Sequence, residues 1–260
     1  MDRLLLIPAT FCFLLVFTHT MIAFGAGTYR RSVFNLVVII IGFAFQTGFL
    51  LCRGEIIRRC PLTNPFEVLM FLNWSMLLLY LLVGPTYRLS LLGAFTTPLV
   101  FILQVIAFLM PLDHVVVAVQ PPSPWLELHA ALSIISYGAF ALGGVAGAMF
   151  LAQERQLKSH QLHPLFYHLP PINELAVAIR HLILCGVLLL TVGLLAGFAV
   201  GSPVEKVIWG AVVWGLYVAI WFAASARRLS PRRLALWVLF AFCGTLVSLW
   251  WISAFSGGKA

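Results

Sequence analysis

The sequence predicts an all-α protein with about eight membrane-spanning helices, and three observations lead to this fold class. Hydrophobic residues make up 62% of the chain and charged residues only 9%, and the mean hydropathy is +1.03. The apolar residues fall in stretches of roughly 20, which is the length that crosses a hydrocarbon core about 30 Å thick. Because lipid offers the backbone no hydrogen-bond partner, each stretch is expected to be a helix.

The expected spans follow one another with short connections, as one integral membrane domain over 1–260. They run over 4–24, 34–52, 66–84, 90–110, 126–152, 176–200, 205–224 and 233–254. We expect the first span to stay in the protein, because Asp2 and Arg3 make a poor start for a signal peptide and no small-residue cleavage site follows. An even number of spans places both termini on one side. The segment 153–168 is polar enough to form an interfacial helix.

Lysines and arginines near the ends of the spans indicate the orientation, since cytoplasmic loops carry more of them. One set of loops carries ten: Arg30, Arg31, Arg88, Arg155, Lys158, Arg180, Arg227, Arg228, Arg232 and Arg233. The other set carries six: Arg3, Arg53, Arg58, Arg59, Lys206 and Lys259. The excess predicts that both termini are extracytoplasmic. The net charge of +8 then belongs to loops that meet anionic lipid headgroups, and no nucleic acid is expected as a partner.

The five cysteines, at positions 12, 52, 60, 185 and 243, show no zinc-binding spacing. Cys52 and Cys60 lie at, or just after, the outer end of the second span. An oxidising compartment there would allow a disulfide between them, and that pairing is a hypothesis.

Ionisable side chains in or beside lipid are costly and therefore indicate function. His129 lies about one turn into the fifth span, and helical spacing places Ser133, Ser136 and Gly144 near the same face. A neutral imidazole there could be an axial ligand of a haem iron. The alternative is a structural histidine that hydrogen-bonds a neighbouring helix.

The other polar residues have simpler interpretations. Arg180 is expected to anchor the sixth span and His181 to lie at the interface beside it. Glycines four apart, Gly143 with Gly147 and Gly193 with Gly197, predict that spans five and six pack closely inside the bundle. His160, His163 and His168 are too unevenly spaced for a good metal site, and His114 beside Asp113 is expected to be solvated.

Some function classes are disfavoured. The sequence contains no nucleophile–base pair, carboxylate pair or phosphate-binding loop, so we do not expect an enzyme. A transporter is disfavoured by the scarcity of charge at mid-membrane and by the lack of an inverted repeat.

Five segments occur in the order and spacing of one family of membrane proteins. They are 60–75 (CPLTNPFEVLMFLNWS), 92–98 (LGAFTTP), 125–138 (WLELHAALSIISYG), 151–158 (LAQERQLK) and 180–197. They resemble the cytochrome c assembly superfamily of CcsA, CcmC and CcmF, and within it the HemX-like or YpjD-like branch. The resemblance covers about 60–225, and 125–138 is similar to the family's histidine-bearing helix.

The resemblance implies that the protein handles haem at the outer face of a bacterial inner membrane during c-type cytochrome biogenesis. Family members use a tryptophan-rich WWD loop flanked by two outer histidines, and His129 falls where the first of these belongs. The partners implied are membrane lipid and either cytochrome c assembly proteins or a haem-synthesis enzyme. The candidate haem-binding residues, with His129 as the iron ligand, are His129, Trp125, Glu67, Asn64, Trp74, Arg180 and His181.

The sequence departs from the family at the WWD loop. Only 198–206 (FAVGSPVEK) connects spans six and seven, with Ser202 where the family has an aspartate, and 250–260 contains no second outer histidine.

Two hypotheses therefore stand. The first is an accessory protein that binds or delivers haem, and it predicts that His129 faces a cavity lined by Trp125 and Glu67. The second is a HemX-like regulator or scaffold without stable haem. It predicts that a protein partner docks on 53–65 or 153–175.

Overall fold

A computed structural model of the chain describes residues 2–26, 33–83, 90–109, 117, 122–159, 171–202 and 204–256. A short 3-10 helix, Asp2–Leu5, precedes the α-helices. These are α1 (Leu6–Gly25), α2 (Val33–Ile57), α3 (Pro65–Val83), α4 (Ser90–Leu109), α5 (Pro124–Ser159), α6 (Ile172–Val200), α7 (Val204–Ser225) and α8 (Pro231–Ser256). Within the described residues, eight helices are long and apolar enough to cross a membrane. The predicted all-α membrane bundle is therefore confirmed.

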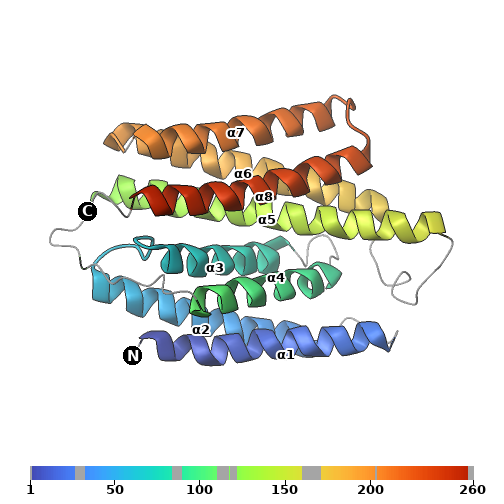
Figure 1. Cartoon of the computed structure of the whole chain (residues 1–260), viewed down its shortest axis with the longest axis horizontal. Helices are drawn as coiled ribbons and strands as arrows, with labels where there is room; N and C mark the ends of the chain where they lie inside the picture. Colours follow the sequence, from blue (N-terminus) through green and yellow to red (C-terminus); the bar gives the residue numbers. More distant parts are fainter. Residues whose placement is uncertain are drawn as a thin grey trace.

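The helices form two groups of four that lie side by side (Figure 1). In the first group α1 and α3 each pack against α2 and α4, and in the second α5 and α7 each pack against α6 and α8. The two groups meet mainly through α3 and α5. Of the apolar part of α5, 83% is buried, compared with 61% for α3 and less for the other helices. The histidine-bearing helix is therefore the central one.

Successive helices run in opposite directions, so α1 begins and α8 ends at the same end of the molecule (Figure 1). We call this the termini end. In the second group of helices, the start of α5, the end of α6 and the start of α7 lie at this end. That the termini end is extracytoplasmic stays a prediction.

Glycines allow α5 to lie close to its neighbours, as their spacing predicts. A Cβ atom at Gly186 of α6 would overlap the ring of Phe140, which stacks on Tyr217 with the ring centroids 3.6 Å apart. A Cβ at Gly147 would lie 3.0 Å from the carbonyl oxygen of Ala235 in α8. The prediction that spans five and six are both interior is correct for α5, of which 83% of the apolar window is buried, but not for α6, of which 44% is buried. α8 as well as α6 packs on the small residues of α5.

Two helices are longer than their apolar stretches. α2 continues past residue 52 to Ile57, and α5 continues to Ser159, so residues 153–159 extend α5 where an interfacial helix was expected. Glu154 supports this extension, because its carboxylate lies 2.7 Å from Lys158 Nζ and 3.4 Å from Arg232 Nε of α8. The rest of the predicted interfacial segment and the histidines at 114, 160, 163 and 168 lie outside the described residues.

Candidate functional site

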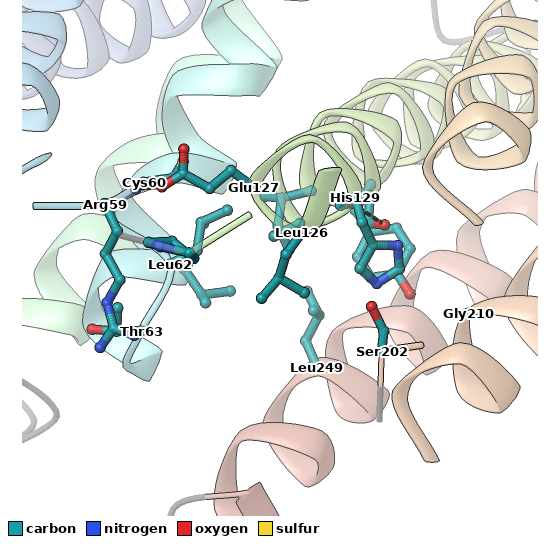
Figure 2. A pocket seen from close by; sticks show the side chains of 16 residues that line it. Arg59, Cys60, Leu62, Thr63, Leu126, Glu127, His129, Ser202, Gly210 and Leu249 are labelled. Atoms are coloured by element: carbon teal, nitrogen blue, oxygen red, sulfur yellow. Dashed lines mark hydrogen bonds between the residues drawn. The ribbon is translucent and has the colours of Figure 1, made fainter. Parts of the chain in front are cut away.

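A cavity of about 400 Å³ opens at the termini end, between α5 and the neighbouring helix ends (Figure 2). Its walls come from the first turns of α5, the corner between α2 and α3, the turn between α6 and α7, and the end of α8. The apolar lining includes Leu62, Val68, Leu126, Ile134 and Leu249. Polar lining comes from Arg59, Thr63, Glu127, His129, Ser133 and Ser202. A mostly apolar cavity with a few polar groups is typical of a small-molecule site, and its volume is within the usual range of about 300–1,000 Å³.

His129 reaches this cavity from α5 and is held in one orientation by α6. Its Nδ1 lies 2.7 Å from the carbonyl oxygen of Gly193. A carbonyl oxygen can only accept, so Nδ1 carries a proton, and in the neutral ring Nε2 is the nitrogen with the lone pair. Metal-bound histidines commonly have this arrangement, in which one ring nitrogen donates to a backbone carbonyl and the other is the ligand.

Two glycines of α6 make room for the imidazole. A Cβ atom at Gly197 would lie 2.6 Å from His129 Nδ1, and one at Gly193 would lie 3.2 Å from Ser133 Oγ. The glycine pair that the sequence assigns to helix packing therefore also forms the seat of the histidine ring. Ser133 and Ser136 use their hydroxyls within α5, donating to the carbonyl oxygens of His129 and Ser133 at 2.7 Å.

Ser202 lies next to His129 in the cavity (Figure 2). α6 is capped by Gly201, whose φ is +64°, and the backbone N–H of Ser202 donates to the carbonyl oxygen of Gly197 at 3.1 Å. This helix-ending turn brings Ser202 back over the glycine on which His129 rests. The Ser202 side chain is buried, and its hydroxyl has no hydrogen-bond partner among the described residues. A buried hydroxyl without a partner is unfavourable by about 1–3 kcal/mol, so this group is available to a ligand or to water.

The opposite wall is the corner between α2 and α3, residues 58–64. Arg58 has φ +57°, and the N–H of Arg59 donates to the carbonyl oxygen of Gly54 at 3.2 Å, which ends α2 and directs Arg59 and Cys60 to the cavity. The N–H of Cys60 donates to Glu127 Oε1 at 2.8 Å. Glu127 therefore ties this corner to α5, two residues before His129.

Glu67 holds the same corner from the other side. Its Oε2 accepts hydrogen bonds from the N–H and the hydroxyl of Thr63 at 2.8 and 2.7 Å, while its Oε1 lies 2.9 Å from Arg53 Nε. Asn64 begins α3 by accepting the N–H of Glu67 at 2.8 Å, as in a capping box. Glu67 and Arg53 are both buried. The prediction that Glu67 lines the cavity is wrong, because its carboxylate is fully used within the corner.

Trp125 and Trp74 also lie elsewhere than a haem site would require. Trp125 is 59% exposed at the start of α5 and does not line the cavity. Trp74 packs between α2 and α3, where its Nε1 donates to Thr47 Oγ1 at 2.9 Å and its ring lies on Phe43. The expectation that Trp125 lines the cavity is wrong, because its side chain faces outward from the bundle. Trp74, a candidate for binding the cofactor, makes a contact between α2 and α3 instead.

Arg180 and His181 lie on α6, the helix whose Gly193 and Gly197 contact the His129 ring, but far from these glycines. They lie 13 and 12 residues before Gly193, which at 1.5 Å per residue is about 18 Å along α6. His181 is exposed there. The structure therefore brings His129 to the cavity without these two residues. The seven candidates lie in five places: His129 in the cavity, Glu67 and Asn64 in the corner, Trp125 on the outside of α5, Trp74 between α2 and α3, and Arg180 with His181 on the far part of α6.

Cys52 and Cys60 are free thiols in the structure, so the hypothetical disulfide is not formed. Cys52 is exposed on α2, whereas Cys60 lines the cavity. Burial, together with the smaller effects of the Glu127 and Glu67 carboxylates, raises the pKa of the Cys60 thiol to about 11. At neutral pH this thiol is uncharged and a poor nucleophile.

The residues of the cavity fit a haem better than a bare metal ion. Among the described residues no three His, Cys, Asp or Glu side chains form a metal-binding group, whereas a haem iron needs only an axial ligand from the protein. His129 supplies a fixed imidazole with an available Nε2. The apolar lining suits a macrocycle, and the unpaired Ser202 hydroxyl is left for a polar substituent or water.

An eight-helix membrane protein with a histidine-bearing cavity at one end is the class that fold and site define. The family model described as "Cytochrome C assembly protein" matches residues 62–256. This match covers most of the chain, including every wall of the cavity from Leu62 onward. The protein belongs to the cytochrome c assembly protein family.

Individual relatives agree with this placement. The chain is 29% identical to Protein HemX of Brevibacillus brevis over 188 residues, which is 72% of this chain and 65% of that protein. It is 26% identical to the cytochrome c biogenesis protein CcsA of Prochlorococcus marinus strain MIT 9215 over 268 residues, covering 90% of this chain and 86% of that one. It is 29% identical to CcsA of Chlamydomonas reinhardtii over 196 residues, covering 72% and 49%. Similarity to both HemX and CcsA confirms the family resemblance.

Proposed function

We propose that this protein is a haem-handling accessory factor of c-type cytochrome biogenesis, and that it binds haem in the cavity at the termini end through His129. The observation that carries the proposal is the 2.7 Å hydrogen bond from His129 Nδ1 to Gly193, which fixes the tautomer and leaves Nε2 for a ligand. Membership of the cytochrome c assembly family supports haem as that ligand and the membrane's outer face as the place where it is bound.

Several residues of the chain would take part in binding haem. His129 is the residue that would hold haem, which would supply an iron that an imidazole nitrogen can ligate. The Gly193 carbonyl orients the His129 ring and makes Nε2 more basic, and Gly197 lets the ring lie against α6. The leucines and Ile134 exclude water from the macrocycle. Because one described histidine lines the cavity, binding through it suits a factor that passes haem on.

The proposal is tested by haem titration of the detergent-purified protein, monitored by absorbance in the Soret region. We expect the wild type to give a saturable band that shifts from that of free haem, and His129→Ala to bind at least tenfold more weakly with a changed band position. His181→Ala is the matched control, because it removes an imidazole from the far part of α6, and it should bind as the wild type does. Equal binding by wild type and His129→Ala would contradict the ligand assignment.

A second function is favoured by one observation. α6 ends at Val200 and α7 begins at Val204, so the connection is too short for the tryptophan-rich loop of the CcsA-like proteins, and the chain is also similar to HemX. A membrane regulator or scaffold that binds a protein partner without stable haem would suit these features. It predicts that the His129→Ala variant complements a deletion strain as well as the wild-type protein does. A haem-binding factor would require the histidine for complementation.

A further inference from the structure

We propose that Ser202 sets the orientation of the ligand in the cavity, because its hydroxyl donates a hydrogen bond to a carboxylate of a bound tetrapyrrole. This inference rests on the proposed function and adds to it the chemical class of the ligand and its orientation. The ligand would be a tetrapyrrole with free carboxylates, placed with its metal toward His129 and one carboxylate at the turn between α6 and α7.

The turn that carries Ser202 ends α6 with an uncommon pair of residues. The N–H of Gly201 donates to the carbonyl oxygen of Phe198 at 3.2 Å, and the N–H of Ser202 donates to that of Gly197 at 3.1 Å, which is the Schellman pattern. In this motif an apolar contact frequently joins the side chains at the positions that Gly197 and Ser202 occupy here. Gly197 has no side chain, and a Cβ atom there would lie 2.6 Å from His129 Nδ1. The imidazole therefore takes the place of the apolar contact, with the Ser202 hydroxyl next to it (Figure 2).

The hydroxyl of Ser202 is available to a ligand. The residue is 7% exposed, and its Oγ has no hydrogen-bond partner among the described residues. Ser133, the other described serine that lines the cavity, already donates its hydroxyl to the carbonyl oxygen of His129 at 2.7 Å. A buried hydroxyl without a partner destabilises a protein, so we infer that the partner of Ser202 is the bound ligand.

The start of α7 favours a carboxylate as that partner. α7 begins at Val204, two residues after Ser202, and the first N–H groups of a helix lack intrahelical acceptors and lie at the positive end of its dipole. The negative end of α6 is offset there, because two of its last carbonyl groups accept the N–H groups of Gly201 and Ser202. A hydroxyl that donates to a carboxylate also makes a stronger hydrogen bond than one that donates to a neutral acceptor.

The charged residues around the cavity are compatible with a carboxylate at this turn. Glu205, in the first turn of α7, is exposed and does not line the cavity. The opposite wall carries both Arg59 and Glu127, whose charges act on an acidic group in opposite directions. The turn between α6 and α7 is therefore the wall that favours the acidic edge of the ligand.

The test compares zinc protoporphyrin IX with its dimethyl ester, using fluorescence titration of the protein in a nonionic detergent. Zinc binds imidazole, so His129 can act as in the proposed haem complex, and the ester lacks the two negative charges. The quantity measured is the ratio of the two affinities in each variant, because partition of the ester into detergent affects all variants equally. We expect Ser202→Ala to lower the preference for the free acid about tenfold relative to the wild type, as for a hydrogen bond to a charged group.

Denaturant unfolding of the ligand-free protein is a second readout. Ser202→Ala should be at least as stable as the wild type, because it removes a buried hydroxyl that has no partner among the described residues. A marked loss of stability would show that this hydroxyl is bonded within the protein, and it would overturn the inference.

Ser133→Ala is the matched control, because it removes from the same cavity a hydroxyl that is already bonded within α5, and it should keep the wild-type ratio. A Ser202→Ala variant that is folded by size-exclusion chromatography and keeps the wild-type ratio, or an equal change in Ser133→Ala, would overturn the assignment of Ser202. In either case an intact, His129-dependent haem spectrum would leave the proposed function standing. Absence of any tetrapyrrole binding by the wild type would overturn both.

Discussion

At the scale of single residues, the proposed site depends on how α6 orients one histidine of α5. His129 could have been an ordinary polar contact between helices, and its bond to the Gly193 carbonyl is in part that. The same bond leaves the second nitrogen available on the side of the cavity. A structural contact and a ligand are therefore two uses of one imidazole, which is why the sequence alone left both interpretations open.

Gly197→Ala tests the seat of the ring. Its Cβ would lie 2.6 Å from His129 Nδ1, so the imidazole must move and its bond to Gly193 must lengthen. We expect haem affinity to fall by about 10- to 100-fold, as for other changes that displace a metal ligand. The control is Gly215→Ala in α7, where a Cβ would meet nothing within 4 Å. Equal haem affinity in Gly197→Ala and the wild type would show that the ring orientation is unimportant.

The Cys60 thiol gives a prediction about pH. Its pKa is raised from 9.0 to about 11, mainly by burial, so at pH 8 the reactive thiolate should be about a hundredfold less abundant than for an ordinary cysteine. In a variant that keeps only this cysteine, the rate of alkylation should rise steeply with pH up to about 11. Unfolding in SDS should bring the midpoint back to about 9. A rate in the folded protein that levels off near pH 9 would contradict the burial of this thiol.

At the scale of elements, the corner between α2 and α3 does most to shape the cavity. Two carboxylates hold it, Glu67 from α3 and Glu127 from α5, each by accepting backbone N–H groups. The corner is thereby attached to the helix that carries His129. Its conformation depends on a buried ion pair rather than on apolar packing alone.

Breaking this ion pair should destabilise the protein strongly. Glu67→Ala removes the carboxylate that faces the buried Arg53 and releases Thr63, and we expect a loss of about 3–5 kcal/mol in the free energy of unfolding. Lys158→Ala removes an exposed partner of Glu154 and should lower the free energy of unfolding by less than about 1 kcal/mol. Denaturant unfolding in detergent measures both changes. Equal, small effects would mean that the buried pair does not hold the corner.

The double variant Arg53→Met with Glu67→Ala adds a check. If the two side chains stabilise each other, the double variant should lose less free energy of unfolding than the two single variants lose together. The difference should be about 0.5–3 kcal/mol. Strict additivity would instead indicate that Glu67 acts on Thr63 alone.

The elements could be predicted from the sequence to the extent that their signals are local. Runs of apolar residues gave all eight spans, and the glycine spacing gave the close packing of α5 with α6. The Arg53–Glu67 pair was missed because Arg53 was counted as a loop charge beyond the apolar run. Its position seven residues after Gln46, on the buried face of α2, was the available signal. Glu127 and Ser202 were missed because their roles depend on residues distant in sequence.

At the scale of the whole molecule, two four-helix groups meet along α3 and α5 (Figure 1). The cavity lies at the termini end and takes lining residues from both groups (Figure 2). The family match begins at Leu62 and ends at Ser256, so it includes α3 and α4 as well as the second group. The corner between α2 and α3 joins α2 to this region, so α2 supports the site through Arg53, and the corner itself contributes Arg59 to the cavity.

The orientation of the molecule in the membrane is a separate prediction. The excess of Lys and Arg predicts that the termini end, with the cavity, is extracytoplasmic. A C-terminal fusion to a phosphatase that is active only outside the cytoplasm should therefore be active, and a fusion after Arg228, between α7 and α8, should be inactive. The reverse pattern would place the cavity on the cytoplasmic side and would favour a partner in haem synthesis over one in cytochrome c assembly.

The most direct measurement of the central claim is chemical rescue of the axial ligand. His129→Gly removes the imidazole and leaves its seat against Gly197 empty, so haem affinity and the Soret maximum should change from those of the wild type. Added imidazole should restore both in a saturable way, and it should have no such effect on Gly215→Ala. If haem binds His129→Gly as it binds the wild type, or if imidazole restores nothing to a folded variant, His129 is not the iron ligand.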